Sequence, residues 1–492
     1  MFVNLLLIFV ICFIITIIYF RRPKDIPPGP FPWPVVGNLK LLKKLCRELG
    51  GQHKAFTELS KMYGSNVIRL YLGNSYVNIV SGYEAVQQIL RNEEFDGRPW
   101  TEFAKIRNMG LKKGITMTDG PEWKEMRGWL IRCLKSLGFG HEAMTSKIID
   151  ELKIILDKLK SHGDKAVCMR PIIAPAVINV IWSIAVGKRI DEEARLQYFL
   201  NLMEKRAKAF DIAGGMLSIF PWIRHFAPKL SGYELLITLN EELKELLMKS
   251  IEEHKKNYVE GKEVDLIDMF LAEMYHGKGP EAGFTEDQLL MILIDLFIAG
   301  LQTTAITLDF LFLHMTVYQD IQTKLHHELD SVIDGYRFPQ LSDRAMLPFT
   351  EAIMSESQRL RLVVPIIGPR RVLQETYLDG YRILKNTCIL ININSIHMDP
   401  KNFDDPECFK PERFLKDGIY IPNKKLIFFG GGHRRCPGEI VAKSATFLLF
   451  AGIMKRYKLL PLPGCNLPDT DPLPGLTISP KPYEVLLVER ST

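Results

Sequence analysis

FGGGHRRCPG, residues 429–438, places one cysteine among glycines and arginines, directly before a helix-forming stretch at residues 439–457. Glycine lets the backbone fold tightly around a neighbouring side chain and aim N–H groups at it. The start of a helix and nearby arginines both favour the anionic form of a thiol. The segment therefore predicts that Cys436 is held as a thiolate.

The other cysteines and histidines of the chain bear on which metal this thiolate binds. A lone thiolate with one axial bond suits haem iron better than zinc, which takes four ligands. His433 and Cys436 could begin a zinc site, but the eight cysteines are scattered, form no C-x-x-C pair and complete no such site. A phosphate-binding loop is the other alternative, and the glycine spacing fits neither common form of it.

The composition is that of a globular protein. The chain has 492 residues, of which 47% are hydrophobic and 24% charged, with a net charge of +6. These values exclude a disordered chain, a collagen and a coiled-coil rod. No dense basic stripe is interleaved with aromatic residues, so nucleic acid is not an expected partner.

The amino terminus predicts a membrane anchor. Residues 2–20 form an apolar run of 19 residues, a length that matches a hydrocarbon core, and Arg21 and Arg22 follow at once. A cleaved signal peptide would begin with basic residues and have a shorter apolar run and a cleavage site of small residues. We expect an anchor at residues 1–22, a proline-rich hinge at 23–36 and one catalytic domain at 37–492, on the cytosolic side.

The remainder predicts a mainly α fold with small β-sheets. Residues 67–71 and 76–80 indicate a hairpin, and the pattern from 101 to 361 is mostly helical. An amphipathic surface helix is expected at residues 235–258. Short β-type runs are expected at residues 381–384, 388–393 and 483–488.

One helical segment, residues 289–313, is apolar on nearly all sides. Asp295, Gln302 and Asp309 interrupt it at intervals of seven and so share one face. Two carboxylates inside a membrane span would be costly, so we expect a buried core helix. The Thr303 hydroxyl could bond its own backbone four residues earlier, or face a ligand that Gly300 lets approach closely. Both readings stay open.

Taken in order, these motifs resemble the cytochrome P450 family. Residues 429–438 look like its haem-binding signature, F-x-x-G-x-R-x-C-x-G, and residues 299–304 like its oxygen-binding stretch on helix I. Three further matches are Trp123 with Arg127 in a W-x-x-x-R pattern, Glu356 with Arg359 in an E-x-x-R pattern, and Arg413 as the third member of that pair. The anchor and hinge resemble the microsomal branch, so the likeness covers the whole chain.

The resemblance implies a cytochrome P450-like fold with an N-terminal transmembrane anchor, and a mono-oxygenase with haem b, whose iron Cys436 ligates. It implies propionate contacts by Trp123, Arg127 and Arg434, joined by Arg98 and Arg370. It gives Thr303 the catalytic task of organising proton delivery to oxygen. Gln302 stands where the family usually has an acid, and an amide cannot release a proton at neutral pH, so we expect a water chain to supply protons. Glu356, Arg359 and Arg413 are expected to be structural.

The resemblance also implies partners and a location. Electrons are expected from the NADPH–cytochrome reductase, with cytochrome b5 as an additional donor, at the endoplasmic reticulum membrane. The expected basic docking residues on the cysteine side are Arg132, Lys135, Lys424, Lys425 and Arg435. The positions where relatives line the substrate pocket are apolar here, which predicts a lipophilic substrate.

The sequence is most similar to arthropod microsomal members of the family, among them the methyl farnesoate epoxidases of juvenile hormone biosynthesis. We therefore expect NADPH-dependent epoxidation of methyl farnesoate. Two other activities stay open: hydroxylation of steroids, fatty acids or foreign compounds, and a haem-dependent isomerisation of peroxides that needs no proton. A third alternative, a haem sensor without activity, is disfavoured by Thr303 and by the hinged anchor.

Overall fold

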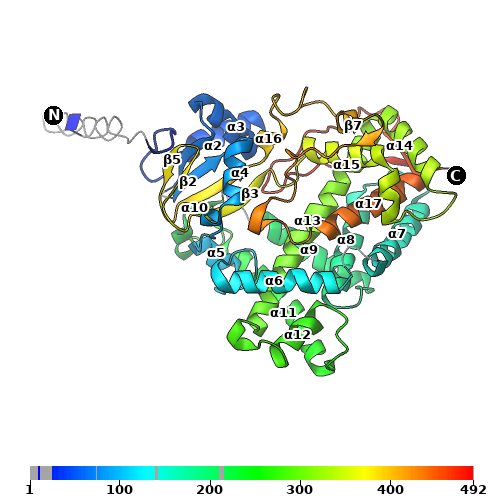
Figure 1. Cartoon of the computed structure of the whole chain (residues 1–492), viewed down its shortest axis with the longest axis horizontal. Helices are drawn as coiled ribbons and strands as arrows, with labels where there is room; N and C mark the ends of the chain where they lie inside the picture. The colour runs from blue at the N-terminus through cyan, green and yellow to red at the C-terminus, as the bar shows by residue number, and fades with distance from the viewer. Residues whose placement is uncertain are drawn as a thin grey trace. The chain divides into compact units, whose positions relative to one another are not determined.

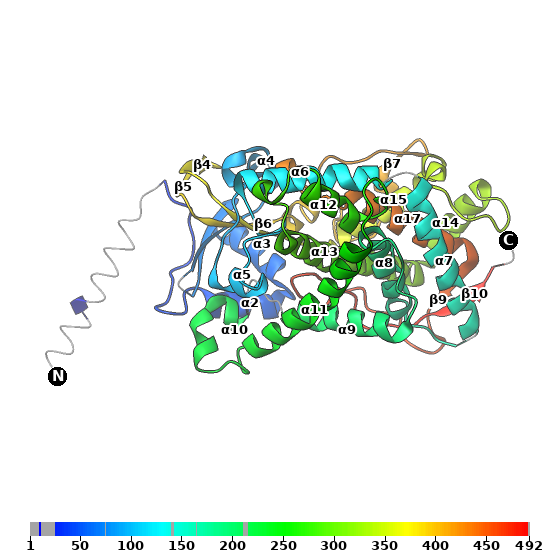
Figure 2. The same ribbon diagram turned by 90° about the horizontal axis from the view of Figure 1, so that it is seen from below.

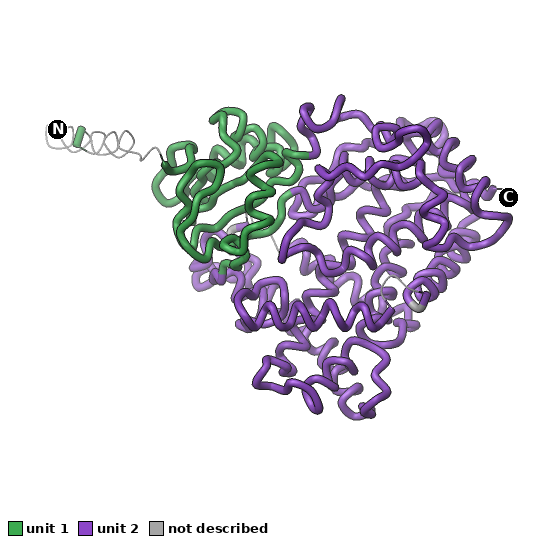
Figure 3. Tube along the Cα trace, in the orientation of Figure 1, with its two compact units in different colours: residues 1–99, 366–396 green, residues 100–365, 397–492 purple. Residues whose placement is uncertain are grey.

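The computed structural model describes residues 9–10, 25–73, 75–138, 142–163, 165–209 and 215–490. The predicted anchor lies outside these residues apart from residues 9–10, and so remains a prediction. The chain forms two compact units, shown in different colours in Figure 3. We call residues 1–99 with 366–396 the sheet unit, and residues 100–365 with 397–492 the helical unit. Both take residues from the region predicted as one catalytic domain.

The sheet unit is built on a four-stranded sheet with the order β1-β2-β6-β3. β1 (Val67–Leu72) and β2 (Ser75–Val80) pair antiparallel, with Leu70 opposite Val77, which confirms the predicted hairpin. β6 (Cys388–Asn392) runs parallel to β2 and antiparallel to β3 (Ile366–Arg371). Because β6 and β3 come from far along the chain, the sheet joins two distant segments.

Short helices and a second, small sheet complete this unit, and α3 packs against β1 and β6 (Figure 1). The Asn392 side chain at the end of β6 donates to the backbone oxygen of His53 in α3 at 3.0 Å. The remaining elements are α2 (Leu39–Leu49), α3 (Gln52–Tyr63), α4 (Tyr83–Arg91), η1 (Glu93–Phe95), β4 (Thr376–Leu378), β5 (Tyr381–Ile383) and, after β6, α16 (Asn394–His397).

The helical unit carries most of the predicted helices and the cysteine loop. Its helices are α5 (Glu102–Arg107), α6 (Gly120–Ser136), α7 (Glu142–His162), α8 (Arg170–Ala185), α9 (Glu193–Ala209), α10 (Met216–Ile219), α11 (Tyr233–Asn257), α12 (Leu266–Tyr275), α13 (Glu286–Val317), α14 (Gln319–Val332), α15 (Pro348–Leu360) and α17 (Glu439–Arg456). Its short helical turns and strands are η2 (Pro221–His225), η3 (Pro280–Ala282), η4 (Leu341–Met346), η5 (Pro411–Phe414), η6 (Gly432–Arg434), β7 (Leu415–Lys416), β8 (Ile419–Tyr420), β9 (Tyr457–Leu460) and β10 (Leu486–Glu489).

Helix α13 runs through the core of the helical unit, packed against α8 and α17 (Figure 2). Its start is fixed locally, because the Thr285 side chain accepts a hydrogen bond from Gln288 N. In the described part of the chain it is the one helix of 18 residues or more that is apolar enough to cross a membrane. Most of its apolar window is buried in protein, which confirms the prediction of a core helix.

The predicted elements are present with bounds shifted by up to four residues, as in α13, which begins three residues before and ends four residues after the predicted 289–313. The amphipathic helix is α11, with Leu239, Leu243 and Leu247 on its buried face. The predicted strand at residues 483–488 instead begins at Leu486, where it pairs with Leu460 of β9. Before β10 the backbone pairs elsewhere, because Val485 exchanges hydrogen bonds with Val167 at 2.9 and 3.0 Å.

Candidate functional site

The cysteine loop closes on itself before α17 begins. Cys436 N donates to the oxygen of Phe429 at 2.9 Å, and Arg435 N donates to the oxygen of Gly432 at 3.2 Å. Gly430 and Gly432 have φ angles of +69° and +62°, in the left-handed region that other residues rarely adopt. Gly430 and Gly432 are therefore required by the turn that presents the cysteine.

The surroundings of the Cys436 thiol include the predicted groups that lower its pKa, and also burial, which raises it. Burial raises its pKa, and this outweighs the N–H of Gly438 and the charges of Arg127 and Arg435, which lower it. The predicted thiolate is therefore that of a cysteine bound to iron, since the charges of the loop do not by themselves offset burial. By surface area the Cys436 side chain is nevertheless exposed. The two observations agree if many protein atoms surround the residue but leave one side of it open. A metal ion bound on that open side would deprotonate the thiol.

Trp123 and Arg434 lie face to face beside this loop. The Arg434 guanidinium carbon is 3.5 Å from the centroid of the Trp123 ring, and its NH2 group donates to the oxygen of Thr118 at 2.7 Å. Trp123 belongs to α6 and is almost fully buried. Its indole Nε1 is buried and has no acceptor within the described residues. A buried N–H without an acceptor is costly, so this donor calls for a ligand atom.

Arg127 joins the same group one turn later on α6. Its NH2 group donates to the backbone oxygen of Arg435, and its guanidinium carbon lies 5.9 Å from the Trp123 ring centroid. The structure thus brings Trp123, Arg127 and Arg434 together beside Cys436. An exposed cysteine residue, two guanidinium groups and an indole donor without an acceptor in the described chain fit a haem, which offers iron and two anionic propionates.

The other two predicted arginines belong to the sheet unit. Arg98 donates through NH1 to the backbone oxygens of Gly368 and Pro369 at 3.0 and 2.6 Å. The Arg370 guanidinium is buried and forms a 2.6 Å ion pair with Asp96. This pairing favours a structural task for Arg370, because Asp96 already neutralises its charge. This pair could not be predicted from the sequence, since the two residues are 274 positions apart.

The middle of α13 is less covered by protein than the rest of this helix. Ala299 is exposed, and Gln302 and Thr303 are half-buried, whereas the flanking residues of the same face, Asp295 and Asp309, are buried. The Thr303 hydroxyl donates to the oxygen of Ala299 at 2.7 Å. This bond confirms the backbone reading of Thr303, and the contact with a ligand stays a prediction that its remaining lone pairs allow. We call Ala299, Gln302 and Thr303 the open face of α13.

Gly300 has a different task from the one expected. A side-chain carbon at this position would lie 2.5 Å from Cδ1 of Ile181 in α8. The glycine therefore lets α8 and α13 pack closely, and its lack of a side chain is explained without a ligand.

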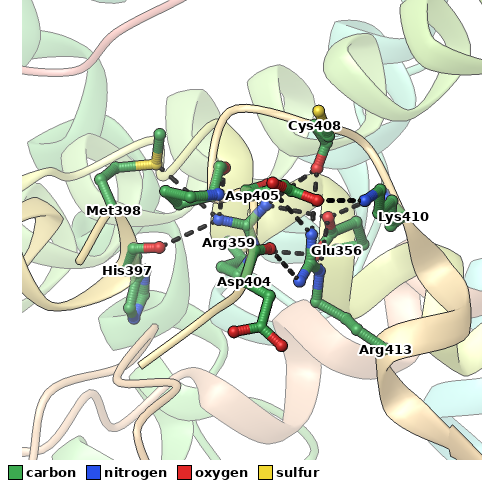
Figure 4. A network of polar contacts seen from close by, with 10 residues as sticks. Glu356, Arg359, His397, Met398, Asp404, Asp405, Cys408, Lys410 and Arg413 are labelled. Carbon is green, nitrogen blue, oxygen red and sulfur yellow. Dashed lines mark hydrogen bonds and ion pairs between the residues drawn. The ribbon is translucent and has the colours of Figure 1, made fainter. Parts of the chain in front are cut away.

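The expected ion network of Glu356, Arg359 and Arg413 is present and buried (Figure 4). Arg359 contacts the Glu356 carboxylate through two nitrogens at 2.7 and 2.8 Å, and Arg413 Nε lies 3.0 Å from the same group. Arg359 also donates to the backbone oxygen of His397 at 2.9 Å. The network ties α15 to η5 and to the chain around residues 397–410, and no part of it reaches Cys436.

Comparisons with known proteins agree with this geometry. The family model described as Cytochrome P450 matches residues 27–487. The chain is 38% identical over 482 residues to a probable cytochrome P450 305a1 of Drosophila melanogaster, covering 96% of this chain and 95% of that protein. It is 34% identical over 493 residues to a farnesoate epoxidase of Bombyx mori, covering 99% of both. Cytochrome P450 2U1 of Bos taurus is 33% identical, over 95% of this chain and 90% of that protein.

Proposed function

The chain belongs to the cytochrome P450 family, which makes it a haem-dependent mono-oxygenase, and we propose that it epoxidises a farnesoyl lipid, methyl farnesoate, in juvenile hormone biosynthesis. The observation that links the enzyme assignment to particular residues is the exposed residue Cys436 with Trp123, Arg127 and Arg434 beside it. The farnesoate epoxidase of Bombyx mori supports the substrate, because the two chains match over almost their full lengths.

Cys436 is the residue that we assign to the iron. When bound, a haem with a cysteine thiolate supplies the activation of molecular oxygen. The Trp123 indole and the Arg434 and Arg127 guanidinium groups would hold its propionates through charge-assisted hydrogen bonds. The propionate contact of Arg98 stays a prediction from the sequence. Arg370 would act through Asp96, by fixing the backbone around residues 95–98.

Thr303 and Gln302 are assigned to the oxygen side. The Thr303 hydroxyl is fixed by Ala299 O and can hold a water at its free lone pair. The Gln302 side chain makes no hydrogen bond with the part of the chain that is described, so it can orient a second water. An amide orients water without giving up a proton. Protons would therefore reach the site along water that these two side chains hold in place.

Electrons would come from the membrane-bound NADPH–cytochrome reductase, with cytochrome b5 as an additional donor. Arg132, Lys135, Lys424 and Arg435 are exposed in the helical unit that carries Cys436. Arg435 also pairs with Glu439 at 2.6 Å, so it contributes less net charge than the others. We place the enzyme at the endoplasmic reticulum membrane, held by residues 1–22. Reversing the charges of Lys135 and Lys424 should raise the reductase concentration needed for half-maximal turnover.

Product analysis tests the substrate directly. The purified full chain, reconstituted with reductase, should convert methyl farnesoate into its epoxide when NADPH and oxygen are both present. No epoxide above the control without NADPH would contradict the proposal. A steroid or fatty acid hydroxylated in its place would favour a hydroxylase, and turnover of a peroxide without NADPH would favour an isomerase.

A further inference from the structure

Three side chains that can bind a metal ion come together where α11 ends and α12 begins. They are His254 in the last turn of α11, Asp265 at the cap of α12 and Asp268 three residues later. One ligand atom of each lies within 4.8 Å of the others, and in the described part of the chain this is the one group of three or more His, Cys, Asp or Glu side chains placed so closely. The helices α11 and α12 pack on each other in the helical unit (Figure 1). The group takes no part in the cysteine loop, so the haem assignment leaves it unexplained.

Hydrogen bonds fix the orientation of the His254 ring. Its Nδ1 lies 2.6 Å from the backbone oxygen of Ser250, which can only accept, so Nδ1 carries a proton and donates it. Its Nε2 lies 2.9 Å from the carboxylate oxygen Oδ2 of Asp265, which is a second acceptor. Nε2 therefore has to hold either a second proton or a metal ion. A metal-binding histidine commonly donates its other ring N–H to a backbone oxygen, and Ser250 provides that contact.

The two carboxylates each keep an oxygen that the helix cap does not use. Oδ1 of Asp265 accepts a hydrogen bond from Asp268 N at 2.9 Å, and Oδ2 of Asp268 accepts one from Val264 N at 3.3 Å. Oδ2 of Asp265 and Oδ1 of Asp268 take no part in this cap. A side-chain carbon at Gly187 would lie 2.6 Å from Oδ2 of Asp265. This oxygen, on a residue that is 2% exposed, is thus held beside the imidazole with no side chain at residue 187 to crowd it.

The charges of the group favour a divalent cation. Burial raises the pKa of Asp268, and the negative charge of Asp265 raises it further, so the two carboxylates repel each other. Lys255, the residue after His254 on α11, pairs with Glu286 at 2.6 Å instead. A protonated His254 offsets one of the two negative charges, whereas a divalent cation with a neutral imidazole offsets both.

From this arrangement we propose that His254, Asp265 and Asp268 bind a zinc ion that fastens the end of α11 to the start of α12. Zinc takes nitrogen and carboxylate ligands at about 2.0–2.2 Å in tetrahedral sites, which places the ligand atoms about 3.5 Å apart. The 2.9 Å between Nε2 and Asp265 Oδ2 is close to this spacing, and the half-buried Asp268 completes the site by turning its side chain. Calcium and magnesium prefer sites made of oxygen atoms, so the imidazole selects zinc.

The ion serves the fold and not the reaction. It joins His254 to Asp265, eleven residues further along the chain, and so closes the loop at residues 258–264. It takes the place of the second proton on Nε2, no electron is transferred, and water fills the fourth ligand position. The inference goes beyond the proposed function, because neither the substrate nor the haem takes part.

The zinc content of the holoenzyme tests this inference without turnover. The purified full chain is freed of loose metal with a chelator, dialysed against micromolar zinc, and analysed for zinc and iron together, so that haem iron counts the protein. Wild type should retain one zinc per haem more than His254→Gln or Asp268→Asn. Asp268→Asn keeps an oxygen for Val264 N and so leaves the cap of α12 in place. The comparison between proteins is needed because exposed cysteines such as Cys168 also attract zinc.

Proteolysis of the loop gives a second measurement. In wild type, zinc at ten times its dissociation constant should slow cleavage within residues 258–264 about tenfold, because the bound ion holds the loop closed. Neither His254→Gln nor Asp268→Asn should show this protection. The matched control is His276→Gln, because His276 is exposed, lies 3.8 Å from Glu260 and is outside the group, so this variant should keep both the zinc and the protection. Each variant is first checked for an intact haem spectrum.

A wild-type chain that holds no more zinc than His254→Gln and Asp268→Asn would overturn the inference and leave His254 and Asp265 as an ion pair held by a second proton. Loss of the zinc in His276→Gln would also overturn it, because the ion would then bind to the exposed surface. If one of the two variants of the group fails to fold, the other decides. Absence of an epoxide in product analysis would be a failure of the proposed function alone and leaves this inference untouched.

Discussion

The Arg434 guanidinium stacks on the Trp123 ring at 3.5 Å, while the indole N–H of Trp123 is buried without an acceptor in the described chain. The stack holds both donors on the side of the cysteine loop. Their arrangement explains how a tryptophan on α6 and an arginine more than three hundred residues later serve one ligand.

Replacing Trp123 by phenylalanine keeps a ring under Arg434 and removes the N–H group. Loss of a hydrogen bond to a charged group costs about 1.5–3 kcal/mol, so haem should dissociate roughly 10–100 times faster. The rate of haem transfer to an excess of apomyoglobin measures this. Trp129→Phe on the same helix is the control, because the Trp129 ring packs in the hydrophobic core, with edge contacts to Phe270 and Phe284. Equal haem loss from both variants would rule out a special role for the Trp123 N–H.

Replacing Glu356 by glutamine breaks a buried ion network (Figure 4). It leaves two guanidinium groups without their shared carboxylate, so the free energy of unfolding should fall by about 3–5 kcal/mol. Chemical denaturation followed by circular dichroism measures this change. The matched control is Glu412→Gln, whose pair with Lys324 is half-exposed and should be worth under about 1 kcal/mol. Similar losses in both variants would contradict a structural role for the network.

Asp309 makes the stability depend on pH in a predictable direction. Burial raises its pKa from 3.8 to about 6, so the folded chain holds this proton more tightly than the unfolded chain does. Stability should therefore fall as pH rises from about 4 to 6, and above that range the ionised group costs roughly 3 kcal/mol. Asp309→Asn should stabilise the protein at pH 7.5 and have little effect at pH 4. Thermal unfolding at both values checks this, and an equal effect at both would refute it.

Gln302 offers a test of the water-borne proton supply. Gln302→Glu introduces a group that can release a proton. It should therefore raise the coupling, which is the amount of product formed per NADPH consumed. Product and NADPH consumption are measured in the same reaction, with Gln302→Asn as the amide control. If coupling and turnover are the same in wild type and Gln302→Glu, the amide has no bearing on proton delivery.

Features set by neighbouring residues were predictable from the sequence. The turn before Cys436 needs glycines at fixed positions. Thr285 caps α13 by accepting a hydrogen bond from the residue three positions later, and Glu356 pairs with Arg359 one helical turn later. Each of these features depends on residues a few positions apart, so the spacing of residue types in the sequence is enough to predict it. The division into two units was not predictable, because β6 and β3 return to a sheet begun by β1 and β2.

Contacts between residues far apart in the sequence could not be predicted, for the same reason. Asp96 pairs with Arg370 across 274 positions, and Asn240 holds Arg206 across 34. Nothing in the pattern of either arginine marks it as buried. Burial also raises the pKa of the Cys436 thiol, an effect of the whole fold that the residues next to it in the sequence do not show. The burial and the partners of such groups depend on the packing of the whole fold.

The most direct test of the account is the absorption spectrum of the reduced, carbon-monoxide-bound protein, with Cys436→His as the comparison. The account predicts that the wild-type band lies at the position of thiolate-ligated haem, and that the variant moves to the position of histidine ligation or loses haem. A wild-type protein that stays free of iron after full haem supply, or whose band already matches histidine ligation, would contradict the assignment of Cys436.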